Sequence, residues 1–270
     1  MQAEKEETKD QPEIKSEEAP KKEAPSQTVP KSFEISPNSE SESIKIIKKG
    51  NDNSQLNISY NFLFKVSLIG DSGTGKTSIL TRFIDNVFKD DTATTIGVDF
   101  KIVSFDLGES TYAKMQIWDT CGSERFRSLT ANFLKTCSAF VLVFDLTRAG
   151  TFTSIDNWIK TINENTKPKF LILIGNKSDM VNERQVSKED ILKYCEKNNL
   201  NYIEISARNN ENVEKIFKEV AYQLYSEIKS KKINEDQGAM KEFEIGGYKN
   251  IKIGNGKKES KEPTKKCCNI

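Results

Sequence analysis

A glycine-rich segment directly after an apolar run is the feature that most constrains how this chain can fold. The apolar run covers residues 62–69, and it is followed by Gly70-Asp71-Ser72-Gly73-Thr74-Gly75-Lys76-Thr77. This spacing matches G-x-x-x-x-G-K-[S/T], in which glycines let the backbone bend around phosphates with its NH groups pointing inward. The pattern predicts a buried strand, a phosphate-binding turn and a helix over residues 77–88. A glycine-rich turn that binds nothing is the alternative.

The end of this segment supplies charge and a metal ligand. Lys76 contributes a positive charge, and the NH groups that open the helix add the positive end of its dipole. The Thr77 hydroxyl is placed to bind a magnesium ion. The candidate phosphate-binding residues are Gly70, Asp71, Ser72, Gly73, Thr74, Gly75, Lys76, Thr77 and Ser78.

A second polar turn, Asn176-Lys177-Ser178-Asp179, also follows an apolar strand and predicts a pocket for guanine. A carboxylate such as Asp179 accepts two parallel hydrogen bonds from guanine, whereas adenine presents the opposite order of donors and acceptors on that edge. Asn176 is expected to brace the loop, and the stem of Lys177 to lie along the base. Polar turns are common, so the prediction depends on the phosphate loop about a hundred residues upstream.

Two further turns complete the predicted site. Asp119 and Gly122 follow the strand expected near residues 112–118. Asp119 is expected to hold magnesium through a water, and the Gly122 NH to approach a terminal phosphate; an ordinary turn after a strand is the alternative. The segment Ser206-Ala207-Arg208 follows another strand and offers backbone NH groups to the guanine carbonyl.

Between about Phe62 and Ile228 the chain resembles a Ras-superfamily small GTPase, and most of all its Rab branch. Besides the motifs above, the Rab-like strings TIGVDF at 95–100, KMQIWDT at 114–120 and FDLT at 144–147 carry the resemblance. The resemblance implies that Thr95 closes over both the metal and the terminal phosphate when GTP is bound, beside Thr77 and Asp119. It also implies that effector proteins bind a surface made of Ile96, Gly97, Val98, Asp99, Phe100, Trp118 and Phe133. For the aromatic residues Phe100, Trp118 and Phe133, the alternative is that they belong to the ordinary hydrophobic core.

The chain departs from the family pattern at two places. Ser123 stands where the family has the glutamine that orients the attacking water, so Lys76 and Ser123 are the catalytic candidates and slow intrinsic hydrolysis is expected. Activating proteins of the Rab type can supply a glutamine and an arginine from the partner side, which leaves accelerated hydrolysis open. Asn132-Phe133-Leu134-Lys135 replaces the common Y-Y-R-G, so the identity of the effectors does not carry over.

Composition indicates one globular domain between two polar segments. Residues 1–60 hold five of the seven prolines and little apolar periodicity, so they are expected to be disordered, although the short apolar piece at 44–49 could touch a membrane. Residues 61–230 form the GTPase domain, and 231–270 a flexible tail. Alternating strands and helices predict an α/β three-layer fold, a mostly parallel six-stranded sheet with helices on both faces. Strands are expected near 62–69, 100–107, 112–118, 139–145, 169–175 and 201–206.

The tail resembles a prenylation signal. Lysines precede Cys267-Cys268-Asn269-Ile270, and lipids on these cysteines beside a basic stretch would hold the chain to anionic membranes. Two unmodified thiols in a frayed tail are the alternative. We expect a reduced cytosolic setting and the cytoplasmic face of intracellular membranes, because the five cysteines form no disulfide pattern and the N-terminus lacks an apolar signal segment.

Charge and composition exclude several other functions. The chain has no histidine, which removes histidine general-base and histidine metal chemistry, and its net charge of +1 argues against nucleic-acid binding. The expected ligands are Mg²⁺ and GTP or GDP. By resemblance, the expected partners of a monomeric chain are effector proteins, an exchange factor, an activating protein, a GDP-dissociation inhibitor and the prenylation machinery.

Two functional classes follow from these motifs. The first is a switch that hydrolyses GTP, and the second is a GTP-binding scaffold on membranes that scarcely hydrolyses it. Ser123 is the residue that separates them. A nucleotide kinase is a distant third class, because it explains neither the Asn176–Asp179 turn nor the paired cysteines near the C-terminus.

Overall fold

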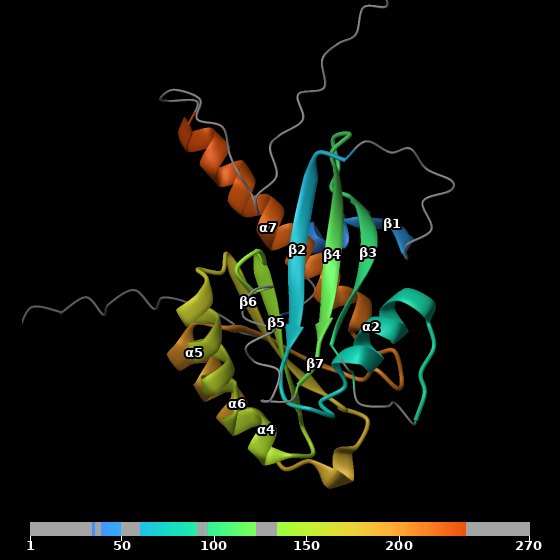
Figure 1. Cartoon of the computed structure of the whole chain (residues 1–270), viewed down its shortest axis with the longest axis vertical. Helices are drawn as coiled ribbons and strands as arrows, with labels where there is room; N and C mark the ends of the chain where they lie inside the picture. Colours follow the sequence, from blue (N-terminus) through green and yellow to red (C-terminus); the bar gives the residue numbers. More distant parts are fainter. Residues whose placement is uncertain are drawn as a thin grey trace, which may run out of the picture. The chain divides into compact units, whose positions relative to one another are not determined.

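The computed structural model describes residues 34–35, 39–49, 60–90, 95, 97–122 and 134–235, and all statements below concern these residues. Strands and helices alternate along them (Figure 1). In chain order the elements are α1 (Ser39–Glu42), β1 (Lys45–Lys49), β2 (Phe62–Ile69), α2 (Lys76–Asp85), β3 (Val98–Asp106), β4 (Tyr112–Thr120), β5 (Ala139–Asp145), α4 (Ala149–Thr153), α5 (Ile155–Asn165), β6 (Phe170–Asn176), η2 (Val181–Glu183), α6 (Lys188–Asn198), β7 (Asn201–Ile205) and α7 (Val213–Glu235).

These strands form one seven-stranded sheet in the order β1-β3-β4-β2-β5-β6-β7. Strands β4, β2, β5, β6 and β7 run parallel, whereas β3 pairs antiparallel with β4 and β1 pairs antiparallel with β3. The predicted α/β class with a mostly parallel sheet is confirmed. The predicted number of strands is wrong by one, because β1 comes from a segment expected to be disordered.

The central strands send alternate side chains to two apolar cores, one on each face of the sheet. Val141 and Val143 of β5 belong to the core under α2 and α7, whereas Phe140, Leu142 and Phe144 belong to the core under α5 and α6. This alternation follows from the pleat of a strand. Every residue of β5 is buried, as expected for a strand covered on both faces.

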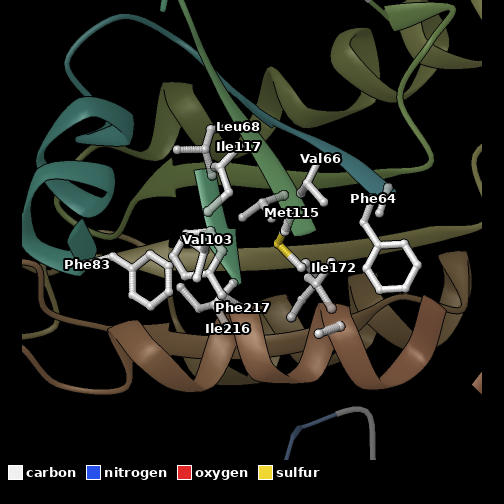
Figure 2. Packing of buried hydrophobic residues seen from close by; sticks show 14 of the residues in the cluster. Phe64, Val66, Leu68, Phe83, Val103, Met115, Ile117, Ile172, Ile216 and Phe217 are labelled. Atoms are coloured by element: carbon white, nitrogen blue, oxygen red, sulfur yellow. The ribbon is translucent and has the colours of Figure 1, made fainter. Parts of the chain in front are cut away.

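The last helix, α7, closes the first core (Figure 2). Phe217 of α7 stacks on Phe83 of α2, with 4.1 Å between ring centroids. The apolar stripe of this helix is buried throughout: Val213, Ile216, Phe217, Val220 and Leu224. Helix α2 is therefore held firmly, and its first turn carries the residues of the phosphate loop.

The described part of residues 34–49, which we call the strap, is ordered in the structure, so the expectation of disorder is wrong for these residues. The Ile35 N–H donates to the Tyr202 carbonyl oxygen beside β7 at 2.9 Å, and β1 pairs with β3. Between these contacts α1 packs against α7, where the Tyr222 hydroxyl donates to the Glu40 carboxylate. Ile44 is only 2% exposed and Ile46 packs against the same core, so these two residues face the interior of the domain.

The strap forms because the six predicted strands leave β3 and β7 as sheet edges with unpaired backbone groups. Pairing with β1 satisfies part of the β3 edge, and Lys45 lies opposite Asp106 in that ladder. Five residues among many polar neighbours are too short a signal to identify such a strand from sequence.

Within the described ranges, no helix is long and apolar enough to cross a membrane.

Candidate nucleotide-binding site

The phosphate loop joins β2 to α2 at the carboxyl ends of the parallel strands, where such sheets bind ligands. Gly73 and Gly75 have φ angles of 73° and 92°, a region that favours glycine. A β carbon on Gly75 would lie 2.3 Å from Asn176 Nδ2, and one on Gly70 would lie 2.0 Å from the Val143 carbonyl oxygen. The glycines are therefore required both by backbone conformation and by close packing.

Lys76 folds back over this loop. Its Nζ donates to the carbonyl oxygens of Gly70 and Asp71 at 2.7 and 2.8 Å. Burial lowers the pKa of Lys76 to about 8, although the nearby carboxylates of Asp119 and Asp71 oppose this shift. The ammonium thus lies beside the loop that is expected to receive phosphates, in surroundings where an anion would stabilise its charge.

We expect the affinity for GDP to fall about tenfold between pH 7.5 and pH 9, because GDP phosphates favour protonated Lys76 and the ligand-free pKa is about 8. Without ligand, the lowered pKa means that the folded state binds fewer protons than the unfolded state between pH 8 and 10.5, so stability should rise over that range. Calorimetric titration at both pH values measures the first effect. Equal affinities would contradict this role of Lys76.

Three oxygen-bearing side chains meet beside Lys76, where a metal ion was predicted. Thr77 Oγ1 lies 2.7 Å from Thr95 Oγ1 and donates to Asp119 Oδ2 at 2.6 Å. Burial raises the pKa of Asp119, against the hydrogen bond from Thr77 and the charge of Lys76. Asp119 Oδ1 is buried and has no hydrogen-bond partner within the described ranges. This orphaned oxygen, with two hydroxyls nearby, fits a hard cation such as Mg²⁺.

Asn176 connects the predicted guanine loop to the phosphate loop. Its Nδ2 donates to the Thr74 carbonyl oxygen at 2.8 Å, and its Oδ1 accepts from the Ala207 N–H at 3.3 Å. Asp179 Oδ1 accepts from the Ser206 hydroxyl at 2.6 Å, so the 206–208 segment meets the same loop. The structure thus brings together the three segments that the sequence placed far apart.

Arg82 of α2 supports this arrangement from behind, although no motif identified it. Its Nε donates to the Ala207 carbonyl oxygen at 2.8 Å, and its Nη2 donates to the Arg208 carbonyl oxygen at 2.8 Å. Helix α2 therefore positions both the phosphate loop at its start and the 206–208 segment along its side.

A cavity of about 280 Å³ lies between these loops. The lining residues that the sequence predicted are Ser72, Gly73, Gly75, Lys76, Thr77, Ser78, Thr95, Gly122, Asn176, Lys177, Asp179, Ala207 and Arg208. The other predicted residues of the phosphate, metal and guanine groups lie behind this wall and contact it: Gly70, Asp71, Thr74, Asp119 and Ser206. The cavity volume lies just below the range of about 300 to 1,000 Å³ that is typical of small-molecule sites.

Sequence reasoning missed Phe88, Lys89, Asp90, Thr120 and Met180, which also line the cavity. The guanidinium carbons of Arg82 and Arg208 lie 5.9 and 5.7 Å from the centroid of the Phe88 ring. Phe88 follows α2 in a segment without a motif. The apolar pair Val87-Phe88, followed by the polar residues Lys89 and Asp90, is the signal that could have pointed to it.

The predicted effector surface is only partly described. Phe100 and Trp118 are cross-strand partners on β3 and β4, with 4.7 Å between ring centroids, and both are half-buried. Trp118 also packs against the second core, which agrees with the core alternative, and its effector role stays a prediction. Gly97, Val98 and Asp99 lie at the start of β3. Ile96, Ser123, Phe133, Cys267 and Cys268 lie outside the described residues.

Gly122 is close to the phosphate loop. A β carbon on Gly122 would lie 2.5 Å from the Ser72 backbone nitrogen. Such an approach leaves no room for a side chain at Gly122, and Thr120 and Gly122 line the same cavity as Thr77 and Thr95.

A mostly parallel sheet with a G-x-x-x-x-G-K-T loop between a buried strand and a helix is typical of the P-loop class of nucleotide-binding proteins. Residues 65–226 match the Ras family. The chain is similar to Ras-related protein Rab-1 of Theileria parva, at 42% identity over 63% of this chain and 77% of that protein. It is also similar to Rab-25 of Mus musculus and RABA2a of Arabidopsis thaliana, at 40% and 41% identity over 65% and 66% of this chain and 82% of each relative. This chain belongs to the Ras family of small GTPases, in its Rab branch.

Proposed function

We propose that this chain is a molecular switch that binds GTP and GDP with Mg²⁺ and hydrolyses GTP. The observation that carries the proposal is the Asn176 side chain, which joins the guanine loop to the phosphate loop at one cavity. Membership of the Rab branch supports the same ligand. A nucleotide kinase gives no reason for Asp179 to line a base pocket beside a phosphate loop.

The residues around the cavity have separable tasks. The NH groups of the phosphate loop and the Lys76 ammonium bind and orient the phosphates and offset the charge that builds up during transfer to water. Thr77, Thr95 and Asp119 would hold a magnesium ion, which neutralises phosphate charge when bound. Because Thr95 and Gly122 both line the phosphate end, loss of a terminal phosphate would release both segments.

The test is a calorimetric comparison of guanosine and adenosine nucleotides in the presence of Mg²⁺. GDP and GTP are expected to bind at least about 100-fold more tightly than ADP and ATP, because adenine cannot donate the two hydrogen bonds that Asp179 accepts. Replacement of Lys76 by alanine should lower the affinity for all four of these nucleotides. Equal binding of guanosine and adenosine nucleotides, or binding indifferent to Lys76, would exclude the proposed site.

Hydrolysis is proposed to be slow because Ser123 is too short to orient the attacking water as a glutamine does. Ser123→Gln is expected to raise the rate of intrinsic hydrolysis by about tenfold or more. Single-turnover assays, in which GTP is bound first and magnesium is then added, measure the rate of hydrolysis without a contribution from the rate of product release. Nucleotide dissociation should be unchanged in the variant, which separates hydrolysis from binding.

The same assay decides between the two functional classes. Measurable hydrolysis by the wild-type chain supports the switch, whereas a rate indistinguishable from that of free GTP supports the membrane scaffold that was the alternative. A wild-type rate equal to that of relatives with glutamine at this position would show that Ser123 does not limit hydrolysis.

The cellular role proposed from the Rab branch is regulation of membrane trafficking through effectors recruited in the GTP state. Lipids on Cys267 and Cys268 would hold the monomeric chain to the cytoplasmic face of intracellular membranes, and a GDP-dissociation inhibitor would extract it. An exchange factor would promote replacement of GDP by GTP, and an activating protein would promote hydrolysis of the bound GTP. Mass spectrometry of the chain from its own cells tests the lipids, since two prenyl groups, one or none give different masses.

A further inference from the structure

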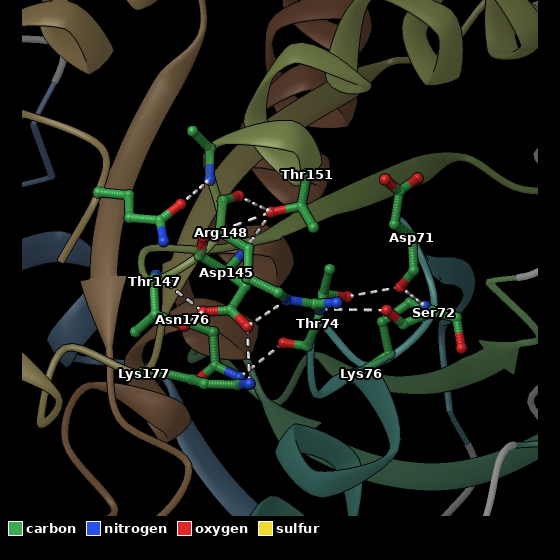
Figure 3. Close-up of polar contacts among 12 residues, drawn as sticks. Asp71, Ser72, Thr74, Lys76, Asp145, Thr147, Arg148, Thr151, Asn176 and Lys177 are labelled. Carbon is green, nitrogen blue, oxygen red and sulfur yellow. Dashed lines mark hydrogen bonds and ion pairs between the residues drawn. The ribbon is translucent and has the colours of Figure 1, made fainter. Parts of the chain in front are cut away.

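Asp145, at the end of β5, carries a buried carboxylate that the proposed nucleotide contacts do not use. The side chain is 0% exposed and receives four hydrogen bonds (Figure 3). Its Oδ1 accepts from the Thr147 N–H at 2.9 Å and from the Thr147 hydroxyl at 2.7 Å. Its Oδ2 accepts from Arg148 Nε at 2.9 Å and from Lys177 Nζ at 2.6 Å. Although burial opposes ionisation, these donors hold the pKa of Asp145 below its ordinary value.

One cation bound to Asp145 belongs to the guanine loop. Lys177 lines the cavity and adopts a φ angle of 68°, which residues with a β carbon disfavour. Its ammonium is held at Asp145 Oδ2 at 2.6 Å. The backbone reinforces this position, because Asp145 pairs with Asn176 across β5 and β6. The buried carboxylate therefore helps to hold the guanine loop in a conformation that it would not otherwise prefer.

The other cation reaches the phosphate loop. Arg148 Nη2 donates to the Ser72 carbonyl oxygen at 3.1 Å, and the same nitrogen would lie 3.3 Å from a β carbon on Gly73. The guanidinium thus contacts the phosphate loop through Nη2 while its Nε donates to Asp145. One carboxylate oxygen consequently connects, through two side chains, the loop that receives phosphates and the loop that receives the base.

We propose that Asp145 is a positioning residue that couples the phosphate loop to the guanine loop through Arg148 and Lys177, and thereby slows nucleotide release. The inference rests on the proposed function. Without the carboxylate charge, a guanidinium and an ammonium remain side by side and repel each other, so both loops loosen. The Asn176 bond to Thr74 is a separate link between these loops, so the coupling is weakened and not abolished.

The experiment measures the dissociation rate of a fluorescent GDP analogue, in Mg²⁺ and with excess unlabelled GDP as the chase. Asp145→Asn should raise the rate by about tenfold, and Arg148→Ala by about threefold, because it breaks only the arm to the phosphate loop. Arg148→Lys keeps a charge near Asp145 but cannot also span to Ser72, so it should resemble Arg148→Ala. The matched control is Asp156→Asn, an exposed carboxylate on α5 that contacts Tyr194 away from the cavity.

The double variant Asp145→Asn with Arg148→Ala gives the readout that a merely structural role would not produce. If Arg148 acts through Asp145, the double variant should release the analogue no faster than Asp145→Asn alone, whereas independent roles would multiply the two effects to about thirtyfold. Multiplied effects would overturn the proposed coupling.

The remaining outcomes separate this inference from the proposed function. A wild-type chain that retains no GDP overturns both. A wild-type chain that retains GDP, with Asp145→Asn as slow as Asp156→Asn, overturns the inference alone. If circular dichroism shows that Asp145→Asn does not fold, the two variants of the exposed residue Arg148 decide the test. Dissociation rates equal to that of the wild type in both Arg148→Ala and Arg148→Lys overturn the proposal.

Discussion

Asp179→Asn is expected to reduce the affinity for GDP by about 100-fold or more, since two hydrogen bonds to a charged acceptor are replaced by at most one to a neutral amide. The same variant should bind xanthosine diphosphate better than GDP. Xanthine carries a carbonyl where guanine carries its amine, and the asparagine amide can donate to that carbonyl. Calorimetric titration with both diphosphates measures the reversal.

The reversal distinguishes recognition of the base from damage to the loop. Asp179 also accepts from the Ser206 hydroxyl at 2.6 Å, and an asparagine oxygen can still accept that bond. Asp85→Asn, at an exposed carboxylate near the end of α2, is the control and should bind both ligands as the wild type does. If Asp179→Asn lowered the affinities for GDP and xanthosine diphosphate equally, Asp179 would not be the residue that recognises the base.

Deletion of residues 1–49 is expected to lower the free energy of unfolding by about 4 kcal/mol and the melting temperature by about 10 °C. The loss combines burial of Ile44, the β1 to β3 ladder and the contacts of α1 with α7. Differential scanning calorimetry measures the change, with GDP and Mg²⁺ at fixed concentrations because bound ligand also raises the melting temperature.

Deletion of residues 1–33 is the matched control. It removes most of the extension but leaves the strap, whose described contacts begin at Glu34. The melting temperature should therefore stay within about 2 °C of the full chain. A large loss in this shorter deletion, or no loss in the longer one, would show that the strap does not stabilise the domain.

The strap also shows what periodicity alone misses. Residues 45–49 read K-I-I-K-K, and a run this short among polar residues does not distinguish a strand from a solvated segment. Its structure depends on an open edge at β3 and on a core that accepts Ile44. Both features require the assembled sheet, so the sequence of residues 45–49 alone indicates disorder, whereas the folded domain orders them as β1.

The sequence by itself determined the features whose physical cause is local. Apolar runs, and alternation of apolar and polar residues near 112–118, indicated the predicted strands, and the glycines at 70, 73 and 75 marked a backbone that side chains would obstruct. The order of donors and acceptors that a carboxylate can satisfy made Asp179 the candidate for guanine. The strands and the phosphate loop need only neighbouring residues, whereas the guanine turn also needs the phosphate loop upstream and the geometry of the ligand.

Only the tertiary structure decided which distant residues cooperate. Asn176 meets the Thr74 carbonyl oxygen across 102 positions of sequence, and Arg148 meets that of Ser72 across 76. Phe88 and Asp145 stand in no motif assigned to the ligand and gain their roles from what packs beside them. The physical reason is that the order of strands in the sheet, and not separation along the chain, sets which loops share the cavity.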